Sequence, residues 1–217
     1  MPPYQIRLMQ RGDVIPVTEI DREAFPDLWP PVNYQHEIRG QLTHYLVACD
    51  TGVVATPVNQ PEKALSGFVR QVKELLGNRQ PTYYETPGQR EPDIIGFIGF
   101  WVLADEAHVT GIAVRKGRRG QGIGERLLLE ALDLARELKA RKVTLEVRVS
   151  NPIAQQLYRK CGFVSRGIRA NYYNNNDENA LSMTIADLTL ASLQQHLSRL
   201  KKDHHQRWGT VLHHGPR

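Results

Sequence analysis

The feature that most constrains this chain is a glycine-rich turn between a predicted strand and its most strongly amphipathic helix. Residues 114–129 read VRKGRRGQGIGERLLL, with Gly120, Gly122 and Gly124 at alternate positions. Glycine lets the backbone approach an anion closely, and the first turn of a helix presents amide N–H groups and the positive end of the helix dipole. The sequence therefore predicts a phosphate-binding turn. Four cations lie beside it: Arg115, Lys116, Arg118 and Arg119.

Two familiar phosphate-binding motifs do not fit this turn. A P-loop ends in Gly-Lys-Ser/Thr, whereas Gly124 is followed by Glu125. A dinucleotide fingerprint counted from Gly120 needs a further glycine at the position that Glu125 occupies. The plain alternative is a turn that only joins a strand to a helix, with the basic residues as a solvated face.

Hydrophobic periodicity predicts a chain in which strands and helices are interleaved. Strands are expected at residues 4–8, 44–49, 94–103, 108–114, 143–149, 163–168 and 180–185. Helices are expected at 14–24, 34–42 and 125–140, between Pro152 and Gly162, and in a tail beyond residue 187. Segment 51–93 has prolines at 57, 61, 81, 87 and 92 around one amphipathic pattern, which indicates an insertion containing a helix.

Composition excludes several classes of protein. Of 217 residues, 41% are hydrophobic and 24% are charged, as in globular proteins. There is no long apolar run and no apolar stretch at the start, so a cytoplasmic protein without membrane contact is expected. Cys49 and Cys161 are far apart, which predicts free thiols. No metal is expected, because His204-His205 and His213-His214 fit a solvated end better. The net charge of +5 suits an anionic partner.

The pattern Arg119-x-x-Gly122-x-Gly124 does fit a known turn, and with it the chain resembles the GNAT superfamily of acyl-CoA-dependent N-acetyltransferases. Residues 94–188 also resemble the RimI-type ribosomal-protein alanine N-acetyltransferases, with a weaker match over 4–49. The resemblance implies an α/β GNAT fold, with a mixed central sheet of about six to seven strands flanked by helices. It implies an acetyltransferase domain over 1–188 that contains the insertion, and a basic tail over 189–217 that is helical or disordered. The motifs that carry the RimI resemblance are Leu145-Glu-Val-Arg-Val-Ser-Asn151, Leu157-Tyr158, Gly162-Phe163, Ile168-Arg169 and Asn171-Tyr172-Tyr173.

The resemblance implies acetyl-CoA as the cofactor, with its pyrophosphate against the backbone amides of the glycine-rich turn. Asn151, which the sequence predicts as a helix cap, is expected also to contact the pantetheine arm. Backbone amides of residues 112–114 would stabilise the oxyanion if that strand parts from strand 143–149. The cofactor-binding residues implied are Ile112, Ala113, Val114, Arg119, Gly120, Gln121, Gly122, Ile123, Gly124, Glu125, Asn151 and Tyr158.

Acetyl transfer to an amine needs a base for the ammonium proton and an acid for the departing thiolate. Side chains alternate strictly along strand 143–149, and Glu146 lies on its polar face. The resemblance implies that Glu146 is the general base and Tyr158 the general acid, a role that suits a phenol with a pKa of about 10. Without the resemblance, Glu146 would be an ordinary solvent-facing carboxylate and Tyr158 a packing residue.

The expected acceptor is the N-terminal α-amine of a protein, such as a ribosomal protein. An α-amine is neutral in roughly a tenth of molecules at pH 7, far more often than a lysine side chain, so it suits a weak base. In the family pattern Tyr172 and Tyr173 line the peptide groove, facing Phe25 and Trp29. Two alternatives stay open: a small-molecule amine or lysine acceptor, and a non-catalytic ribosome- or RNA-binding module. No DNA partner is expected, and the chain is expected to be a monomer or weak dimer.

Overall fold

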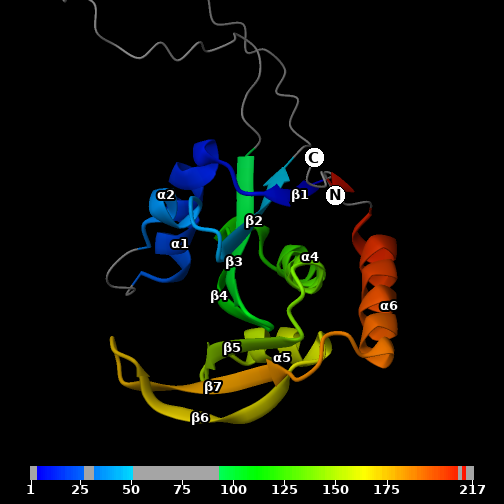
Figure 1. Ribbon diagram of the computed structural model, residues 1–217. Helices are drawn as coiled ribbons and strands as arrows, with labels where there is room; N and C mark the ends of the chain where they lie inside the picture. The colour runs from blue at the N-terminus through cyan, green and yellow to red at the C-terminus, as the bar shows by residue number, and fades with distance from the viewer. Residues whose placement is uncertain (1–3, 27–31, 51–92, 210–211, 214–217) are drawn as a thin grey trace, which may run out of the picture. The chain divides into compact units, whose positions relative to one another are not determined.

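The computed structural model describes residues 4–26, 32–50, 93–209 and 212–213 (Figure 1). The strands are β1 Tyr4–Leu8, β2 Thr43–Asp50, β3 Asp93–Leu103, β4 Glu106–Val114, β5 Lys142–Arg148, β6 Val164–Tyr173, β7 Glu178–Ile185 and β8 Leu212–His213. The helices are α1 Val14–Ala24, α2 Tyr34–Glu37, α4 Ile123–Glu137, α5 Pro152–Lys160 and α6 Ala191–Trp208. The predicted insertion lies outside the described residues except for Asp93, which begins β3.

The strands form one mixed sheet in the order β6-β7-β5-β4-β3-β2-β1-β8. The pairs β4–β5 and β1–β8 are parallel, and the other neighbours are antiparallel. Seven of these strands are the ones that the periodicity predicts, so the mixed α/β sheet is confirmed. The eighth, β8, is a two-residue strand that pairs Leu212 with Gln5. Two residues are too few to show any periodicity in the sequence.

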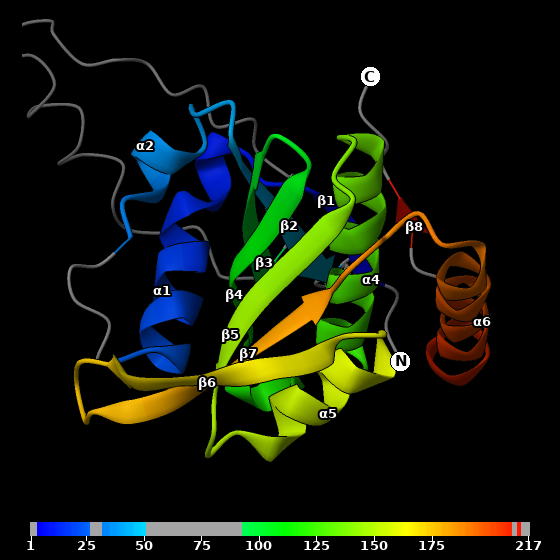
Figure 2. The same cartoon turned by 60° about the horizontal axis from the view of Figure 1, so that its bottom comes forward.

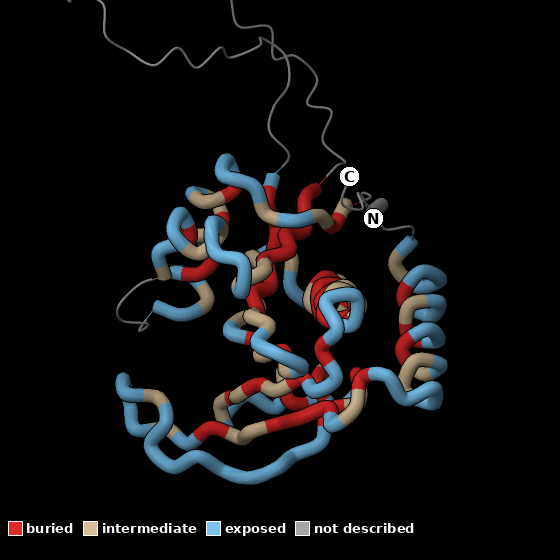
Figure 3. Tube along the Cα trace, viewed as in Figure 1, coloured by how far each residue is buried: buried red, intermediate tan, exposed pale blue. Residues whose placement is uncertain are grey.

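Helices cover both faces of the central strands. Along β2, Tyr45, Val47 and Cys49 pack in the core beneath α1 and α2, while Leu46 and Ala48 pack in the core beneath α4. Side chains alternate between the two faces of a strand. Because helices cover both faces of β2, the residues on both sides are apolar. Figure 2 shows α1 and α2 on one side of the sheet and α4 on the other. Figure 3 shows the buried residues concentrated between these layers.

β4 and β5 separate after a short parallel pairing. Their ladder ends at Val109, which lies opposite Leu145. The next residue of β4, Thr110, lies where the register against β3 shifts, as in a β-bulge. Beyond it, residues 111–114 pair with β3, while β5 continues along β7. The sheet therefore forks between β4 and β5, and in Figure 1 the strands β5, β7 and β6 run across the lower end of β3 and β4.

Two predicted elements differ from the structure in length. The helix expected over 34–42 is only Tyr34–Glu37. It is capped by Asn33, but the chain turns at Gly40, where a Cβ would lie 3.2 Å from the carbonyl oxygen of Glu37. Strand β6 continues to Tyr173, so the aromatic pair at its end lies in a strand, not in the predicted loop.

Two further predictions concern the thiols and the membrane. Cys49 and Cys161 are both buried free cysteines, which confirms the prediction of free thiols. Among the residues that the structure describes, no helix is both long and apolar enough to cross a membrane.

Candidate active site

The glycine-rich turn leads into an α4 N-terminus that no side chain of the described residues caps. Gly120 and Gly122 both have φ of +75°, a conformation that favours glycine, and Gly122 is the N-cap residue. The first amides of α4 have no acceptor within the helix, and the N-cap residue has no side chain to supply one. A Cβ at Gly120 would meet no described atom within 4 Å, so the turn is open on that side. This geometry fits the predicted phosphate-binding turn.

The start of α4 is held between β4 and α5. A Cβ at Gly124 would lie 3.8 Å from Val114 Cγ2 and 3.9 Å from Leu157 Cδ2, which is ordinary van der Waals contact. Glu125, the residue at which the two other motifs fail, forms an ion pair of 2.7 Å with Lys160 of α5. The turn, the fork and α5 therefore meet in one region.

The cations beside the turn are largely paired with carboxylates. Arg115 lies 3.3 Å from Glu19, and Arg119 lies 3.8 Å from Glu23. Arg118 pairs with the buried carboxylate of Asp50. These pairs tie the turn to α1 and β2, so the backbone amides offer a more direct anion site than the arginine side chains.

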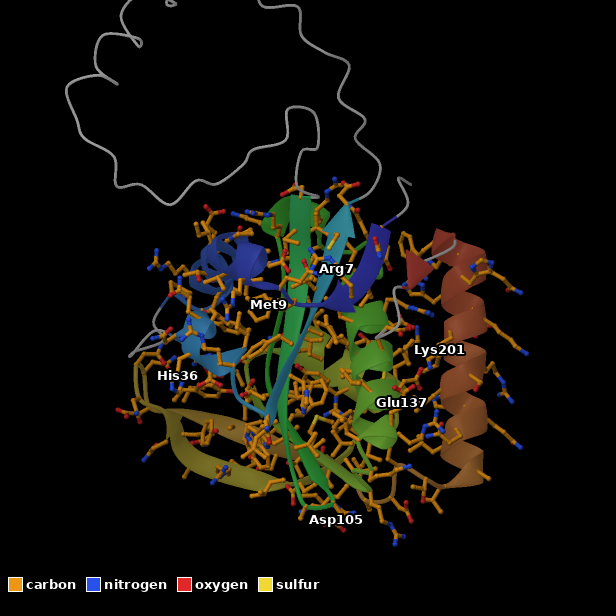
Figure 4. All side chains as sticks on the ribbon, turned by 45° about the horizontal axis from the view of Figure 1, so that its top comes forward. Arg7, Met9, His36, Asp105, Glu137 and Lys201 are labelled. Carbon is orange, nitrogen blue, oxygen red and sulfur yellow. The ribbon has the colours of Figure 1, made fainter. Side chains whose placement is uncertain are left out.

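The C-terminal helix packs against the same turn. His204 Nε2 lies 3.1 Å from the carbonyl oxygen of Gly122 and 3.2 Å from the hydroxyl of Tyr4. His204 is buried, so the expectation of a solvated end is wrong at this position. The reason is that α6 folds back along α4, where Lys201 pairs with Asp133 of α4; Figure 4 labels Lys201 on α6.

This packing makes Gly122 a position where a side chain is costly, and we expect Gly122→Ala to destabilise the protein. A Cβ there would lie 2.5 Å from Trp208 Nε1 and 2.8 Å from His204 Nε2, and the positive φ adds about 1–2 kcal/mol. The added Cβ would therefore press against α6. Thermal unfolding measures the loss, with Gly117→Ala as the matched control, because a Cβ at Gly117 meets no described atom within 4 Å. Equal melting temperatures for the two variants would contradict the packing.

Backbone amides of β4 face the fork at alternate residues. The amide of Arg115 donates to the carbonyl of Ile95 on β3, so its direction fixes that of its neighbours. The amides of Ile112 and Val114 point away from β3, whereas that of Ala113 points toward it. Two of the three amides predicted to stabilise an oxyanion therefore face the fork, and Ala113 does not.

Glu146 is the first residue of β5 beyond the parallel ladder, so it lies where the fork begins. Its side chain is only 11% exposed. Oε1 accepts a hydrogen bond of 2.9 Å from Arg169 Nη1, and the hydroxyl of Ser182 lies 3.4 Å away. Oε2 is buried and has no hydrogen-bond partner among the described residues. The carboxylate thus accepts hydrogen bonds on one oxygen and none from the described residues on the other.

His108 lies beside this carboxylate, and the sequence pattern did not single it out. Its Nε2 is 3.3 Å from Glu146 Oε2 without hydrogen-bond geometry, and its Nδ1 is 2.9 Å from Thr144 Oγ1. The ring stacks on Trp101 with centroids 5.0 Å apart. Burial lowers the pKa of His108, while the carboxylates of Glu146 and Glu106 act in the opposite direction. The histidine reaches Glu146 only because β4 and β5 pair in this register.

Tyr158 and Asn151 both lie on or beside α5. Asn151 Oδ1 accepts from the amide of Ala154 at 3.1 Å, which confirms the predicted helix cap. Tyr158 is 6% exposed, and its ring packs edge-on against Phe163 with centroids 5.9 Å apart. Burial raises the pKa of Tyr158 above its ordinary value, so the phenol keeps its proton at neutral pH.

The predicted acceptor residues reach the fork from two sides. The ring of Phe25 lies 3.8 Å from the Cβ position of Gly111, on the arm of β4 beyond the bulge. Tyr172 packs edge-on against Tyr173, with centroids 5.1 Å apart, and lies beneath the guanidinium of Arg169. The same guanidinium binds Glu146, so it connects these tyrosines to the carboxylate. Trp29 lies outside the described residues.

Comparison with known proteins agrees with this geometry. Residues 14–163 match the Acetyltransferase (GNAT) family. Over 181 residues, the chain is 32% identical to a Bacillus subtilis protein provisionally named a ribosomal protein bS18-alanine N-acetyltransferase, a match that covers 83% of this chain and 93% of that one. Over 183 residues it is 30% identical to the N-alpha-acetyltransferase RimI of Mycobacterium tuberculosis, covering 83% of this chain and 91% of that one.

A solved structure confirms the fold. The ribosomal-protein-S18-alanine N-acetyltransferase from Escherichia coli matches with a TM-score of 0.62 at 22% identity, covering 87% of this chain and 96% of that one. The structural match and the sequence matches point the same way. The chain therefore belongs to the GNAT family of acetyl-CoA-dependent N-acetyltransferases.

Proposed function

We propose that this protein transfers an acetyl group from acetyl-CoA to the N-terminal α-amine of a protein, and that the acceptor begins with alanine. The observation that carries the proposal is the position of Glu146 at the point where β4 and β5 separate. The names of two relatives support the acceptor class, because both specify the alanine of ribosomal protein bS18. We therefore propose the N-terminus of that ribosomal protein as the first substrate to test.

The donor site that we propose is the turn before α4 together with the fork. The uncapped amides of Ile123, Gly124 and Glu125 would hold the pyrophosphate, since they are directed toward one point at the positive end of the helix. The amides of Ile112 and Val114 would face the acetyl carbonyl and stabilise the charge that develops on its oxygen. Bound acetyl-CoA supplies an activated acyl group whose leaving group is a thiolate.

Glu146 and Tyr158 would move the protons. Glu146 Oε2 accepts a proton from the acceptor ammonium, because Oε1 is already engaged by Arg169. Tyr158 donates a hydrogen bond and then a proton to the departing thiolate. Since burial raises the pKa of this phenol, it is protonated whenever the thiolate needs it.

The acceptor would approach on the face of the sheet opposite α4. On β5, Leu145 and Val147 face the core beneath α4, so the alternation places Glu146 on the other face. Phe25 and Tyr172 are 38% and 39% exposed, and both belong to segments that reach this side of the fork. We infer that these rings contact the first residues of the peptide.

A thiol-release assay with acetyl-CoA tests donor, chemistry and acceptor together. We expect release with short peptides that have a free N-terminal alanine, and the strongest signal with the N-terminal sequence of ribosomal protein bS18. The matched control is the same peptide with a blocked N-terminus and an internal lysine, which is expected to be inert. Thiol release with the blocked peptide would indicate a lysine acceptor, and release with a polyamine alone would indicate a small-molecule amine. Either result would contradict the proposed acceptor class. Salt-dependent RNA binding without any thiol release would favour the binding-module alternative.

A further inference from the structure

Glu146 faces a second titratable group across the fork. His108 Nε2 on β4 lies 3.3 Å from Glu146 Oε2, the oxygen that has no hydrogen-bond partner among the described residues. The two side chains are 19% and 11% exposed, so bulk water screens the pair only weakly. Two acceptor atoms at this separation repel each other unless a proton lies between them.

Thr144 determines which nitrogen of His108 carries the proton. The hydroxyl of Thr144 donates to Glu106 Oε1 at 2.9 Å. Hydrogen bonds from Lys142 and Thr144 hold the pKa of Glu106 below its ordinary value, so this carboxylate is ionised and only accepts. A hydroxyl has one proton, and that of Thr144 is used. Thr144 Oγ1 must therefore accept from His108 Nδ1–H at 2.9 Å, which leaves a lone pair on Nε2.

The surroundings disfavour the protonated form of this histidine. Burial is the largest influence on the pKa of His108 and lowers it, and the guanidinium of Arg169 on β6 acts in the same direction. Glu146 on β5 and Glu106 on β4 oppose them. The ring is fixed by Thr144 and stacked on Trp101, and its Nε2 lies 3.3 Å from Glu146 Oε2. A proton delivered to Glu146 Oε2 therefore has a second basic atom nearby.

We propose that Glu146 passes the proton of the acceptor ammonium to His108 Nε2, and that Thr144 and Glu106 are positioning residues that fix the ring and stabilise its positive charge. This inference rests on the proposed function. Two protons leave the nitrogen as the N–C bond forms and the C–S bond breaks. Both protons leave through Glu146 and His108 to solvent. Solvent returns one proton to the Tyr158 phenolate after it has protonated the thiolate, so that the reaction releases one proton overall.

The base is then formed by two side chains, Glu146 and His108, and not by a lone carboxylate. An isolated imidazole is a stronger base than an isolated carboxylate by about two pKa units, so the pair is better matched to an ammonium. The acid limb of the pH–rate profile should therefore move when the histidine is removed. Removing the histidine leaves the weaker base in place.

The experiment is a set of pH profiles of kcat/KM for the wild-type chain, His108→Gln, Thr144→Val and Thr144→Ser. In His108→Gln we expect about a tenfold or greater loss near pH 7 and an acid limb displaced to lower pH by about one unit or more. Thr144→Val should lose activity because the imidazole loses its hydrogen bond to the Thr144 hydroxyl. Thr144→Ser keeps a hydroxyl at this position and should keep the activity of the wild-type chain. A wild-type acid limb in His108→Gln would overturn the inference.

A second measurement does not depend on turnover. Nitrogen NMR of the imidazole in the wild-type chain should show the Nδ1–H tautomer, and the Nε2–H tautomer would overturn the assignment. Glu146→Gln distinguishes a failure of the proposed base from a failure of the role of His108. If that variant is fully active, the proposed base is wrong. If it is inactive while His108→Gln keeps the wild-type acid limb, only the role of His108 is wrong.

Discussion

Glu146→Gln is expected to lower the kcat of acetyl transfer by about 10²- to 10⁴-fold and to leave the affinity for acetyl-CoA unchanged. Glutamine has the same shape, and its carbonyl oxygen can still accept the hydrogen bond that Arg169 gives to Oε1. It has no basic oxygen to take a proton from an ammonium. The loss should therefore fall on kcat, because the proposed donor site lies on the turn before α4 and not on this side chain.

Steady-state kinetics and calorimetric titration with acetyl-CoA measure the two quantities for this variant. Glu130→Gln is the matched control, since Glu130 is a similarly shielded carboxylate that pairs with an arginine, Arg126, at 2.7 Å. It lies within α4 and should keep wild-type turnover. Wild-type kcat in Glu146→Gln would remove this carboxylate from the chemistry.

Tyr158→Phe is expected to be folded and to bind acetyl-CoA, yet to lose about 10²-fold or more in kcat. Only the hydroxyl is removed, and the ring that packs against Phe163 stays in place. Without a proton donor the thiolate must leave unprotonated. A loss of stability alone would give a different pattern, because the melting temperature would fall and kcat per folded molecule would not.

The control for this second variant is Tyr45→Phe. Tyr45 is another buried tyrosine, on β2, and it lies in the core beneath α1 and α2. That variant should turn over normally. If Tyr158→Phe also shows wild-type kcat at an unchanged melting temperature, the thiolate takes its proton from another donor, and water is the next candidate.

The sequence predicts the elements of this fold well because their apolar residues repeat with a clear period. The strand Lys142–Arg148 and the helix Ile123–Glu137 fall within about two or three residues of their predicted limits. The fork was expected only through the family resemblance. It depends on a bulge at Thr110 and on where a parallel ladder stops, and neither leaves a mark in residue periodicity.

The contacts of the candidate site were harder to predict than its elements. The cluster around Glu146 joins residues of β4, β5, β6 and β7, and each contact depends on strand register. His108 is an unremarkable polar residue in its own strand until that register is known. The leucines of the tail predict a helix, but they do not say that it packs on α4. The glycine-rich turn was the easier part, because its residues are consecutive.

The packing of α6 on Gly122 has a practical consequence for work with this protein. The match to the family ends at residue 163, whereas His204 and Trp208 lie beyond it. One wall of the glycine-rich turn is therefore contributed by a region that truncation at the family boundary would remove. Removing or exchanging α6 would therefore change the surroundings of Gly122 while leaving the glycine-rich sequence itself intact.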